Sequence, residues 1–422
     1  MAKAVTRLID EPVLRARLGA ALRAHVEREY SVEAVVPQWE ALFDAVIAEA
    51  RAPAPEPTIF RSFLQGGFEC STHNLRVAEG LRRLDVVAAI GHDTHAEADY
   101  RQLGEHGIRT VRDGMRWHLC EPEPGRFTWD SLVPMLRAAR AAGTQVIWDV
   151  LHYGWPDDID IWSPDFVSRF ARFAGEAARV VRSETEGTLF FCPVNEISFF
   201  SWGGGDAGYL NPWARGRGFE LKVQLARASL AAMDAILAVE PEARFVHCDP
   251  AISVAVDPAR PWEAGHAGGH HEAQFQGWDM LAGRMWPQLG GRPRYLDVIG
   301  VNYYFNNQWI HGGPPIDVGH PLYVPFNQLL ADIYARYGRP ILLAETGTEA
   351  ERRAPWFRFI RDEVRIARSR GVPVEGVCLY PVANHPGWDD DRDCPNGLLS
   401  WQREGGRRRV HGPLAEALAE GF

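Results

Sequence analysis

The sequence lacks the features that mark membrane, nucleic-acid-binding and disulfide-bonded proteins. Its six cysteines are dispersed and form no CxxC pair, so we expect most of them to be reduced side chains in the core. No apolar run approaches the roughly 18 residues of a membrane span, and no signal-peptide core is seen at the start. The formal charge of -10 leaves no dominant basic surface for nucleic acid. These absences predict a soluble, cytoplasmic protein with neither a nucleic-acid nor a membrane partner.

Cofactor and metal signatures are also scarce. No GxGxxG follows a candidate strand, and we interpret the three glycines at 203–205 as a flexible lip rather than a phosphate cradle. His270, His271 and Glu272 are consecutive, so on a helix they point apart and suit a single ion poorly. We expect them to begin a surface helix. The acids at 389–391 lack EF-hand spacing and predict a solvated turn. We therefore expect neither a metal nor a cofactor.

Residues 1–50 differ in pattern from the rest of the chain. Apolar residues recur with helical spacing between Glu11 and Glu29, and a second helix is predicted over 32–50. A stretch rich in proline and alanine follows at 51–58 and is typical of a linker. We predict a helical extension over 1–50, this linker, and a main domain over 59–422.

Beyond residue 59, short apolar runs alternate with amphipathic stretches about eight times, which is typical of a (β/α)8 TIM barrel and implies a parallel sheet. A doubly wound sheet is the alternative. The predicted helices include 131–142, 165–182, 220–239, 326–337 and 355–370. The predicted strands are 63–68, 110–117, 145–151, 189–194, 244–248, 298–302, 341–344 and 374–380.

The predicted strands end in many polar residues. Because chemistry in such barrels gathers where strands pass into the following loops, we expect these side chains to share one cavity. A satisfied polar group at a barrel rim would explain any one of them, but not the whole set. Its members are Arg112, Trp117, His152, Tyr153, Trp155, Asn195, Glu196, His247, Asp249, Asn302, Tyr303, Tyr304, Glu345, Asn384, His385 and Trp388.

Two of these strands end in a glutamate. An apolar run from Phe190 leads into Asn195 and Glu196, and a second run at 340–344 leads into Glu345 and a turn glycine. Carboxylates seldom follow a buried strand unless they are paired or react there. Two such acids at the same end of one barrel form the layout that a two-carboxylate glycosidase needs.

The region of about 59–401 resembles family 1 glycoside hydrolases and, more broadly, clan A retaining β-glycosidases. The resemblance rests on segments that follow in order along the chain: 111–117 with its arginine and tryptophan, LHYGWP at 151–156, PVNE at 193–196, VIGVNYY at 298–304 and ETG at 345–347. Gly154, Ile197 and Thr346 replace the aspartate, proline and asparagine that are usual in the family. The resemblance implies a barrel that cleaves β-linked glycosides, small or oligosaccharide, without a cofactor.

Cleavage with retention requires one nucleophilic and one protonatable carboxylate. We assign Glu345 as the nucleophile and Glu196 as the acid/base. Arg112 and Tyr304 would hold Glu345 ionised, and Asn195 would bind the sugar 2-hydroxyl. The other candidates for binding hydroxyls or orienting the acids are His152 and Asn302.

The sequence departs from the family pattern at positions that bind the substrate in the family. The family's first strand brings a glutamine to the sugar, whereas this chain reads QGGFEC at 65–70, and Glu69 or His73 is the candidate replacement. The eighth strand normally supplies a tryptophan and then an acid that binds the 4- and 6-hydroxyls. Only Trp388 is retained as a stacking platform. The sugar, the linkage and the oligomeric state therefore stay open.

Three alternatives to hydrolysis with retention also stay open. A transglycosylase would use the same acids with an aromatic acceptor site formed by Trp155, Trp162, Trp202 and Trp213. An inverting hydrolase would hold its carboxylates about 6.5–9.5 Å apart. A catalytically silent glycan-binding barrel in a glycan-assembly system is suggested by residues 1–50, which resemble the C-terminal tail of GT-B glycosyltransferases.

Overall fold

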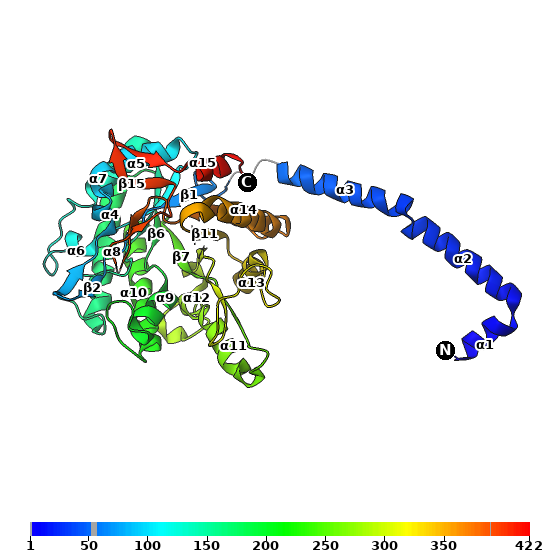
Figure 1. Cartoon of the computed structure of the whole chain (residues 1–422). Coiled ribbons are helices and arrows are strands. Elements are labelled where there is room, and N and C mark those ends of the chain that lie inside the picture. Colours follow the sequence, from blue (N-terminus) through cyan, green and yellow to red (C-terminus); the bar gives the residue numbers. More distant parts are fainter. Residues whose placement is uncertain (1, 52–56, 389) are drawn as a thin grey trace. The chain divides into compact units, whose positions relative to one another are not determined.

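The computed structural model describes residues 2–51, 57–388 and 390–422 (Figure 1). The chain separates into an N-terminal unit up to residue 54 and a second unit from residue 55 onward. Most of the stretch predicted as a linker lies outside the described residues. Where the chain is described, none of its helices combines the length and apolar character needed to cross a lipid bilayer.

The N-terminal unit consists of α1 (Ala2–Asp10), α2 (Pro12–Tyr30) and α3 (Val32–Arg51). Proline at the first position of α2 suits the start of a helix, because its missing N–H has no partner there in any case. No residue of α2 is buried. The helices predicted at 11–29 and 32–50 are therefore confirmed, and α1 precedes them.

The second unit is built on a closed barrel of eight parallel strands, which confirms the predicted TIM barrel and excludes the doubly wound alternative. Each predicted strand is present, shortened or extended by a few residues. Around the barrel the order is β1-β12-β11-β9-β7-β6-β5-β4. The strands are β1 (Leu64–Gly67), β4 (Thr110–Gly114), β5 (Gln145–Asp149), β6 (Phe190–Cys192), β7 (Arg244–Pro250), β9 (Val298–Asn302), β11 (Ile341–Thr346) and β12 (Val374–Leu379).

Helices surround these strands (Figure 1). The longer ones are α5 (His92–Gly104), α7 (Val133–Ala142), α8 (Pro164–Glu184), α10 (Gly218–Val239), α13 (Phe326–Tyr337) and α14 (Arg353–Ser369). Shorter helical segments are α4 (Val86–Ala89), α6 (Trp117–Cys120), α9 (Ile197–Ser201), η1 (Trp202–Asp206), η2 (Pro261–Glu263), α11 (Ala264–Ala273), α12 (Gln276–Leu281), η3 (Pro287–Leu289), η4 (Pro293–Tyr295), η5 (Ala350–Arg352) and α15 (Gly412–Ala419).

Within the described residues, four two-stranded sheets flank the barrel. Three are antiparallel and one, formed by β8 and β10, is parallel. The pairs are β2 (Asn74–Val77) with β3 (Gly80–Arg83), β8 (Ser253–Ala255) with β10 (Gln308–Ile310), β13 (His385–Pro386) with β14 (Asp393–Cys394), and β15 (Leu399–Glu404) with β16 (Arg407–Val410).

Local sequence signals define several helix ends. The Ser163 side chain accepts a hydrogen bond from the Asp165 amide and caps α8, whose first residue is a proline. Helices α7 and α13 both end at glycines in the left-handed conformation, Gly143 at φ 68° and Gly338 at φ 61°. Glycine adopts this conformation without a Cβ penalty, so both helices stop where a strand is about to begin.

The barrel interior is apolar in its middle layers. Several of its side chains stand two positions apart on one strand, as the alternation of a β-strand requires. The cluster comprises Phe60, Ile147, Phe190, Cys192, Val246, Cys248, Val298, Leu342 and Ala344. All six cysteines of the chain are free and buried, which confirms the prediction that they are core residues.

The prediction of a flexible glycine lip is wrong. Residues 203–205 are buried within η1, a single turn of π-helix. A Cβ on Gly205 would lie 2.6 Å from the Gly218 Cα, where α10 begins. The glycines therefore permit close packing of backbone on backbone rather than movement.

The consecutive His270, His271 and Glu272 close α11 instead of starting a helix. The helix begins six residues earlier, directly after the 3-10 turn η2, and its first part is rich in glycine, which hid it in the sequence. At the predicted acidic turn, Asp390 and Asp391 are exposed and form ion pairs with Arg392 and Arg82. Residue 389 lies outside the described residues.

Candidate active site

The two predicted catalytic acids lie at the carboxyl end of the barrel. Glu345 belongs to β11, and Glu196 follows β6 and directly precedes α9. Their exposed fractions are only 5% and 7%. Two carboxylates this deeply buried require compensating partners, and both have them.

A β-bulge turns Glu345 into the cavity. On β11, Leu343 pairs with Val301 of β9, and the next pair joins Glu345 to Asn302. Ala344 is therefore an extra residue on β11 with no partner of its own on β9. Because side chains alternate across a strand, the inward-facing Ala344 would leave Glu345 outside in a regular strand. The extra residue reverses that alternation and directs the Glu345 carboxylate toward the barrel axis.

Glu196 and Tyr153 share an uncommon backbone conformation. Both have positive φ, 52° for Glu196 and 65° for Tyr153, which costs free energy in residues other than glycine. The Glu196 amide is held there by a 2.9 Å hydrogen bond to the carbonyl oxygen of Cys248. Strain at two adjoining residues of one cavity is typical of a functional site.

Glu345 receives one charged and one neutral donor. Arg112 Nη1 donates to Glu345 Oε1 at 2.9 Å, and the Tyr304 hydroxyl donates to Oε2 at 2.9 Å. Burial raises the pKa of Glu345, and the Arg112 charge opposes that rise. The guanidinium and the phenol thus both favour the ionised carboxylate.

Arg112 fixes several strand ends at once. The guanidinium is fully buried and also donates to the Ala344 carbonyl oxygen at 3.0 Å, to Asp149 Oδ2 at 2.7 Å and to Asn195 Oδ1 at 2.9 Å. A buried cation of this kind is stable only with anions beside it. Asp149, at the end of β5, supplies the second negative charge and was not predicted from the sequence.

Glu196 receives only neutral donors. Asn302 Nδ2 donates to Oε1 at 2.8 Å, and the Tyr153 hydroxyl donates to Oε2. Burial raises the pKa of Glu196 well above its ordinary value, and the negative charge of Glu345 raises it further. The pKa of both carboxylates is raised, but that of Glu196, which faces no positive charge, is raised the further.

A continuous chain of hydrogen bonds joins the two acids. Arg112 occupies Asn195 Oδ1, so the Asn195 amide group faces the Tyr153 hydroxyl and His152 Nε2, each at 3.2 Å. His152 Nε2 must then accept, which leaves its proton on Nδ1, 3.0 Å from Asp149 Oδ2. The chain runs from Glu345 through Arg112, Asn195 and Tyr153 to Glu196.

Cys70, Asp149 and His152 form the group in the described chain whose donor atoms come close enough for a shared metal ion, all within 4.8 Å of one another. Their contacts have another explanation. Cys70 Sγ lies 3.2 Å from His152 Nδ1, and Asp149 Oδ2 already accepts from Arg112 at 2.7 Å. A cation there would sit beside the guanidinium, so we interpret the three residues as part of the hydrogen-bond network.

Three further residues close the cavity on the side of β1 and β12. Glu69 Oε1 accepts from both the amide and the hydroxyl of Ser71. His73 is buried at 1% exposure, and neither of its ring nitrogens has a partner. The half-buried Trp388 packs edge-on against His73 and Tyr153, with ring centroids 5.2 and 5.7 Å apart. His73 and Trp388 both pack against Tyr153, which holds Glu196.

Several side chains at strand ends point elsewhere. Trp117 is buried among phenylalanines of α8 and donates to Glu121, which is fully buried and also accepts from Arg169. His247 lies against the Tyr295 carbonyl oxygen. Tyr303 stacks on Phe326 of α13. These residues pack against neighbouring elements. The prediction that they line the cavity was wrong, because it rested only on their polarity at strand ends.

The predicted aromatic acceptor site is not assembled as expected. Trp155 is buried and donates to the Ile159 carbonyl oxygen. Trp162 lies beneath Arg217 and Trp213 beneath Arg76, with guanidinium carbons 3.6 and 4.4 Å from the ring centroids. Trp202 is 53% exposed. Of the four, only Trp202 presents an open ring.

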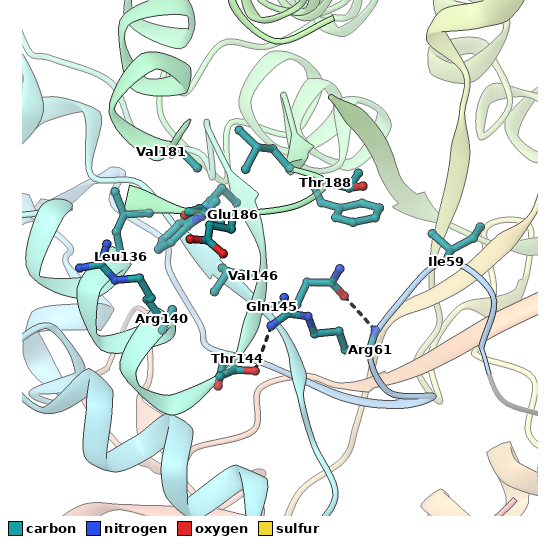
Figure 2. Close-up of a pocket in the computed structure, with 16 residues that line it drawn as sticks. Ile59, Arg61, Leu136, Arg140, Thr144, Gln145, Val146, Val181, Glu186 and Thr188 are labelled. Carbon is teal, nitrogen blue, oxygen red and sulfur yellow. Dashed lines mark hydrogen bonds between the residues drawn. The ribbon is translucent and has the colours of Figure 1, made fainter. Parts of the chain in front are cut away.

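A cavity of about 370 Å³ lies at the opposite, amino-terminal end of the barrel (Figure 2). It opens between the starts of β5 and β6 and the ends of α7 and α8. Figure 2 shows Gln145 beside Arg61, whose backbone N–H donates to Gln145 Oε1 at 3.0 Å. None of the predicted site residues lines this cavity.

The architecture is shared with β-glycosidases of known structure. A β-glycosidase from Pyrococcus horikoshii aligns with a TM-score of 0.68 over 87% of this chain and 95% of its own, at 14% identity. A family 1 β-glucosidase from Thermotoga maritima aligns with a TM-score of 0.63 over 79% of this chain and 88% of its own, at 13% identity. The AHE enzyme from Alicyclobacillus herbarius gives 0.67 over 79% and 87%, at 17% identity.

The TM-scores establish that this chain shares the fold of these enzymes. No protein-family model and no curated protein sequence matches the chain. The comparisons give no support for the glycosyltransferase-tail resemblance of residues 1–50, which stays a prediction.

Proposed function

We propose that this protein is a retaining β-glycosidase in which Glu345 is the nucleophile and Glu196 is the acid/base. The observation that carries the proposal is the unequal treatment of two buried carboxylates in one cavity. Glu345 is paired with the Arg112 guanidinium, whereas Glu196 has neutral donors and a pKa raised well above its ordinary value. Double displacement requires this division between an ionised and a protonated acid.

In the first step, the Glu345 carboxylate attacks the anomeric carbon while Glu196 donates its proton to the departing glycosidic oxygen. The bond from the anomeric carbon to that oxygen breaks, and an ester bond to Glu345 forms. The Tyr304 hydroxyl and Arg112 orient the attacking carboxylate. The aglycone leaves as a neutral alcohol.

In the second step, water releases the sugar from Glu345 while Glu196 acts as the base. Esterified Glu345 no longer carries a negative charge, so the pKa of Glu196 falls and its carboxylate takes a proton from water. The resulting hydroxide attacks the anomeric carbon, and the Glu345 ester bond breaks. The sugar is released with its original anomeric configuration.

Substrate recognition falls to the groups that retain bonding capacity. Asn195 has all its polar atoms engaged, so a sugar 2-hydroxyl would exchange with one of its two long bonds, to Tyr153 or His152. His73, with two unpartnered ring nitrogens, is a better candidate for a sugar hydroxyl than Glu69, which is tied to Ser71.

The proposal is tested by trapping the intermediate. A screen of chromogenic β-glycosides identifies the sugar, and the matching 2-deoxy-2-fluoro glycoside is then used to inactivate the enzyme. We expect the label on the peptide that contains Glu345, and NMR of the first product should show the β-anomer. An α-anomer would indicate inversion, and glycan binding without turnover would indicate a silent barrel.

A further inference from the structure

Asp249 is a buried carboxylate that has no role in the two chemical steps above. It lies near the end of β7 and is only 1% exposed. Because Val246 and Cys248 belong to the apolar interior of the barrel, the alternation of the strand turns Asp249 outward, toward the surrounding helices. The prediction that it shares the cavity with the other strand-end residues is therefore wrong.

Two consecutive residues of β7 hold the backbone on either side of Glu196. The Cys248 carbonyl oxygen accepts from the Glu196 amide at 2.9 Å. The Asp249 carboxylate accepts from the Ser198 amide, at 3.0 Å to Oδ1 and 3.1 Å to Oδ2. The backbone of Glu196, with its positive φ of 52°, thus lies between two anchored amides. Such a conformation persists only where the surroundings hold it firmly.

Helix α12 closes the space behind this carboxylate. A Cβ on Gly277 would lie 3.0 Å from Asp249 Oδ2 and 3.4 Å from the Ile197 Cβ. The glycine therefore lets α12 pack directly on Asp249 and on the first residue of α9. The carboxylate has little room to turn away from the Ser198 amide.

The charge nearest to Asp249 on the helical side is that of Lys222 on α10. Lys222 is buried, and its Nζ donates to the Ala273 carbonyl oxygen at 2.9 Å and to Gln276 Oε1 at 3.0 Å. Burial raises the pKa of Asp249 to about 7, and the Lys222 charge opposes that rise. Ionised Asp249 is thus a second negative charge that faces Glu196, in addition to Glu345.

From this geometry we propose that Asp249 is a positioning residue for the acid/base: it fixes the backbone that presents Glu196 to the glycosidic oxygen, and its negative charge opposes the ionisation of Glu196. The inference rests on the proposed function for the role of Glu196. Asp249 itself touches neither the substrate nor the reacting atoms. It acts from outside the barrel, through the Ser198 amide and through its charge.

Asp249→Asn tests the charge with little change in volume. We expect kcat/KM for an alkyl β-glycoside to fall about 10–100-fold, because proton donation by Glu196 is impaired. The loss should be much smaller for an aryl glycoside whose phenolate departs without a proton. Removing the negative charge lowers the pKa of Glu196, so the alkaline limb of kcat/KM should move to lower pH by about one unit.

Asp279→Asn is the matched control. It removes another buried carboxylate, which lies on α12 and bonds Arg336 and Tyr337 of α13. We expect this variant to unfold at a lower temperature but to keep the alkaline limb of the wild type. Equal losses for both leaving groups in Asp249→Asn, with an unmoved alkaline limb, would overturn the proposal and assign Asp249 a purely structural role.

A crystal structure of Asp249→Ala gives a readout that does not depend on activity. We expect Glu196 to leave its positive φ or to lose its contact with Tyr153, because the Ser198 amide has lost its acceptor. An unchanged Glu196 would overturn the proposal. Displacement of Glu196 in a protein that cleaves no β-glycoside would instead support the positioning role and contradict the proposed function.

Gly277→Ala is a second variant that keeps the carboxylate and crowds Oδ2. It should cause a smaller loss of the same kind, about two- to tenfold for the alkyl glycoside, because the Asp249 side chain must shift away from the new methyl group. A loss of equal size for both leaving groups would count against the proposal.

Discussion

The middle and the carboxyl end of the barrel meet opposite requirements with the same strands. In the middle, inward side chains are apolar and belong to one packed cluster. At the carboxyl end, the next inward positions are Arg112, Asp149, Asn302 and Glu345, all buried and hydrogen-bonded to one another or to Glu196. The apolar layers provide stability through burial. The polar layer is tolerable only because nearly every charge has a partner, and that requirement aligns the groups for chemistry.

A second contrast lies within the polar layer. Both glutamates are buried, but a guanidinium and a phenol face Glu345, whereas an amide and a phenol face Glu196. A single positive charge therefore distinguishes nucleophile from acid. The variants below are ordered by the size of the effect that this division predicts.

Glu345→Gln should cause the largest loss of activity. An amide cannot form the glycosyl ester, so kcat should fall about 10⁴-fold or more. The measurement is the steady-state rate with an activated aryl β-glycoside. Glu349→Gln is the matched control, because it removes a half-buried carboxylate that lies four residues after Glu345 and pairs with Arg392; it should leave kcat within about twofold. Substantial activity in Glu345→Gln would show that another group is the nucleophile.

Glu196→Ala should have an effect that depends on the leaving group. Loss of general-acid catalysis should reduce kcat/KM about 10²–10⁴-fold for an alkyl glycoside. The loss should be much smaller for an aryl glycoside whose phenolate departs without a proton. Added azide should then restore turnover by attacking the intermediate in place of activated water. Equal losses for both leaving groups would assign Glu196 a purely structural role.

His73→Phe removes the two ring nitrogens that have no hydrogen-bond partner and so tests their role in binding. Phenylalanine keeps an aromatic ring against Trp388 and Tyr153 but cannot bond a sugar hydroxyl. We expect kcat/KM to fall about 10–100-fold, since one hydrogen bond to a neutral hydroxyl contributes roughly 1–3 kcal/mol. A deoxy-sugar substrate that lacks the contacted hydroxyl should lose this sensitivity. An equal loss with every deoxy substrate would indicate a packing defect instead.

Tyr304→Phe should shift the pH profile with a modest loss of rate. The phenol stabilises the charged form of Glu345, so its removal raises the pKa of that carboxylate. Because the nucleophile must be ionised, the acidic limb of kcat/KM should move to higher pH, with about a tenfold loss at its optimum. The alkaline limb, set by Glu196, should move less. A shift of the acidic limb toward lower pH would contradict the proposed partnership.

The eight strands were predictable because each is a short apolar run bounded by turn residues, and period-two patterning shows in the residues that now form the core. The end of the barrel that holds the acids was predictable from topology, since parallel strands bring their carboxyl ends together. The shared fold with β-glycosidases agrees with the resemblance found in the sequence motifs.

The partners of those acids were harder to predict, because they depend on backbone detail. Regular alternation from Leu342 places Glu345 outside the barrel, and only the bulge against β9 brings it in. Tyr153 holds Glu196 because its backbone adopts positive φ, a conformation with no sequence signature in a tyrosine. Asp149 is an acid at a strand end like the two glutamates. The argument that an acid at the end of a buried strand is functional, used for Glu196 and Glu345, would also have identified Asp149.

The smallest effect on activity should come from the layer directly below the site. Ile147 is fully buried and precedes Asp149 by two residues, so it lies on the same inward face of β5. Ile147→Val removes one methylene group, which should lower the free energy of unfolding by about 0.5–1.5 kcal/mol. Asp149 keeps its bonds to Arg112 and His152 because they depend on the backbone of β5, so kcat/KM should stay within about twofold. Denaturant unfolding and steady-state kinetics measure the two quantities on the same sample. If kcat/KM instead fell as steeply as in Tyr304→Phe, the apolar and polar layers would be coupled, and the division of roles between these two layers would be wrong.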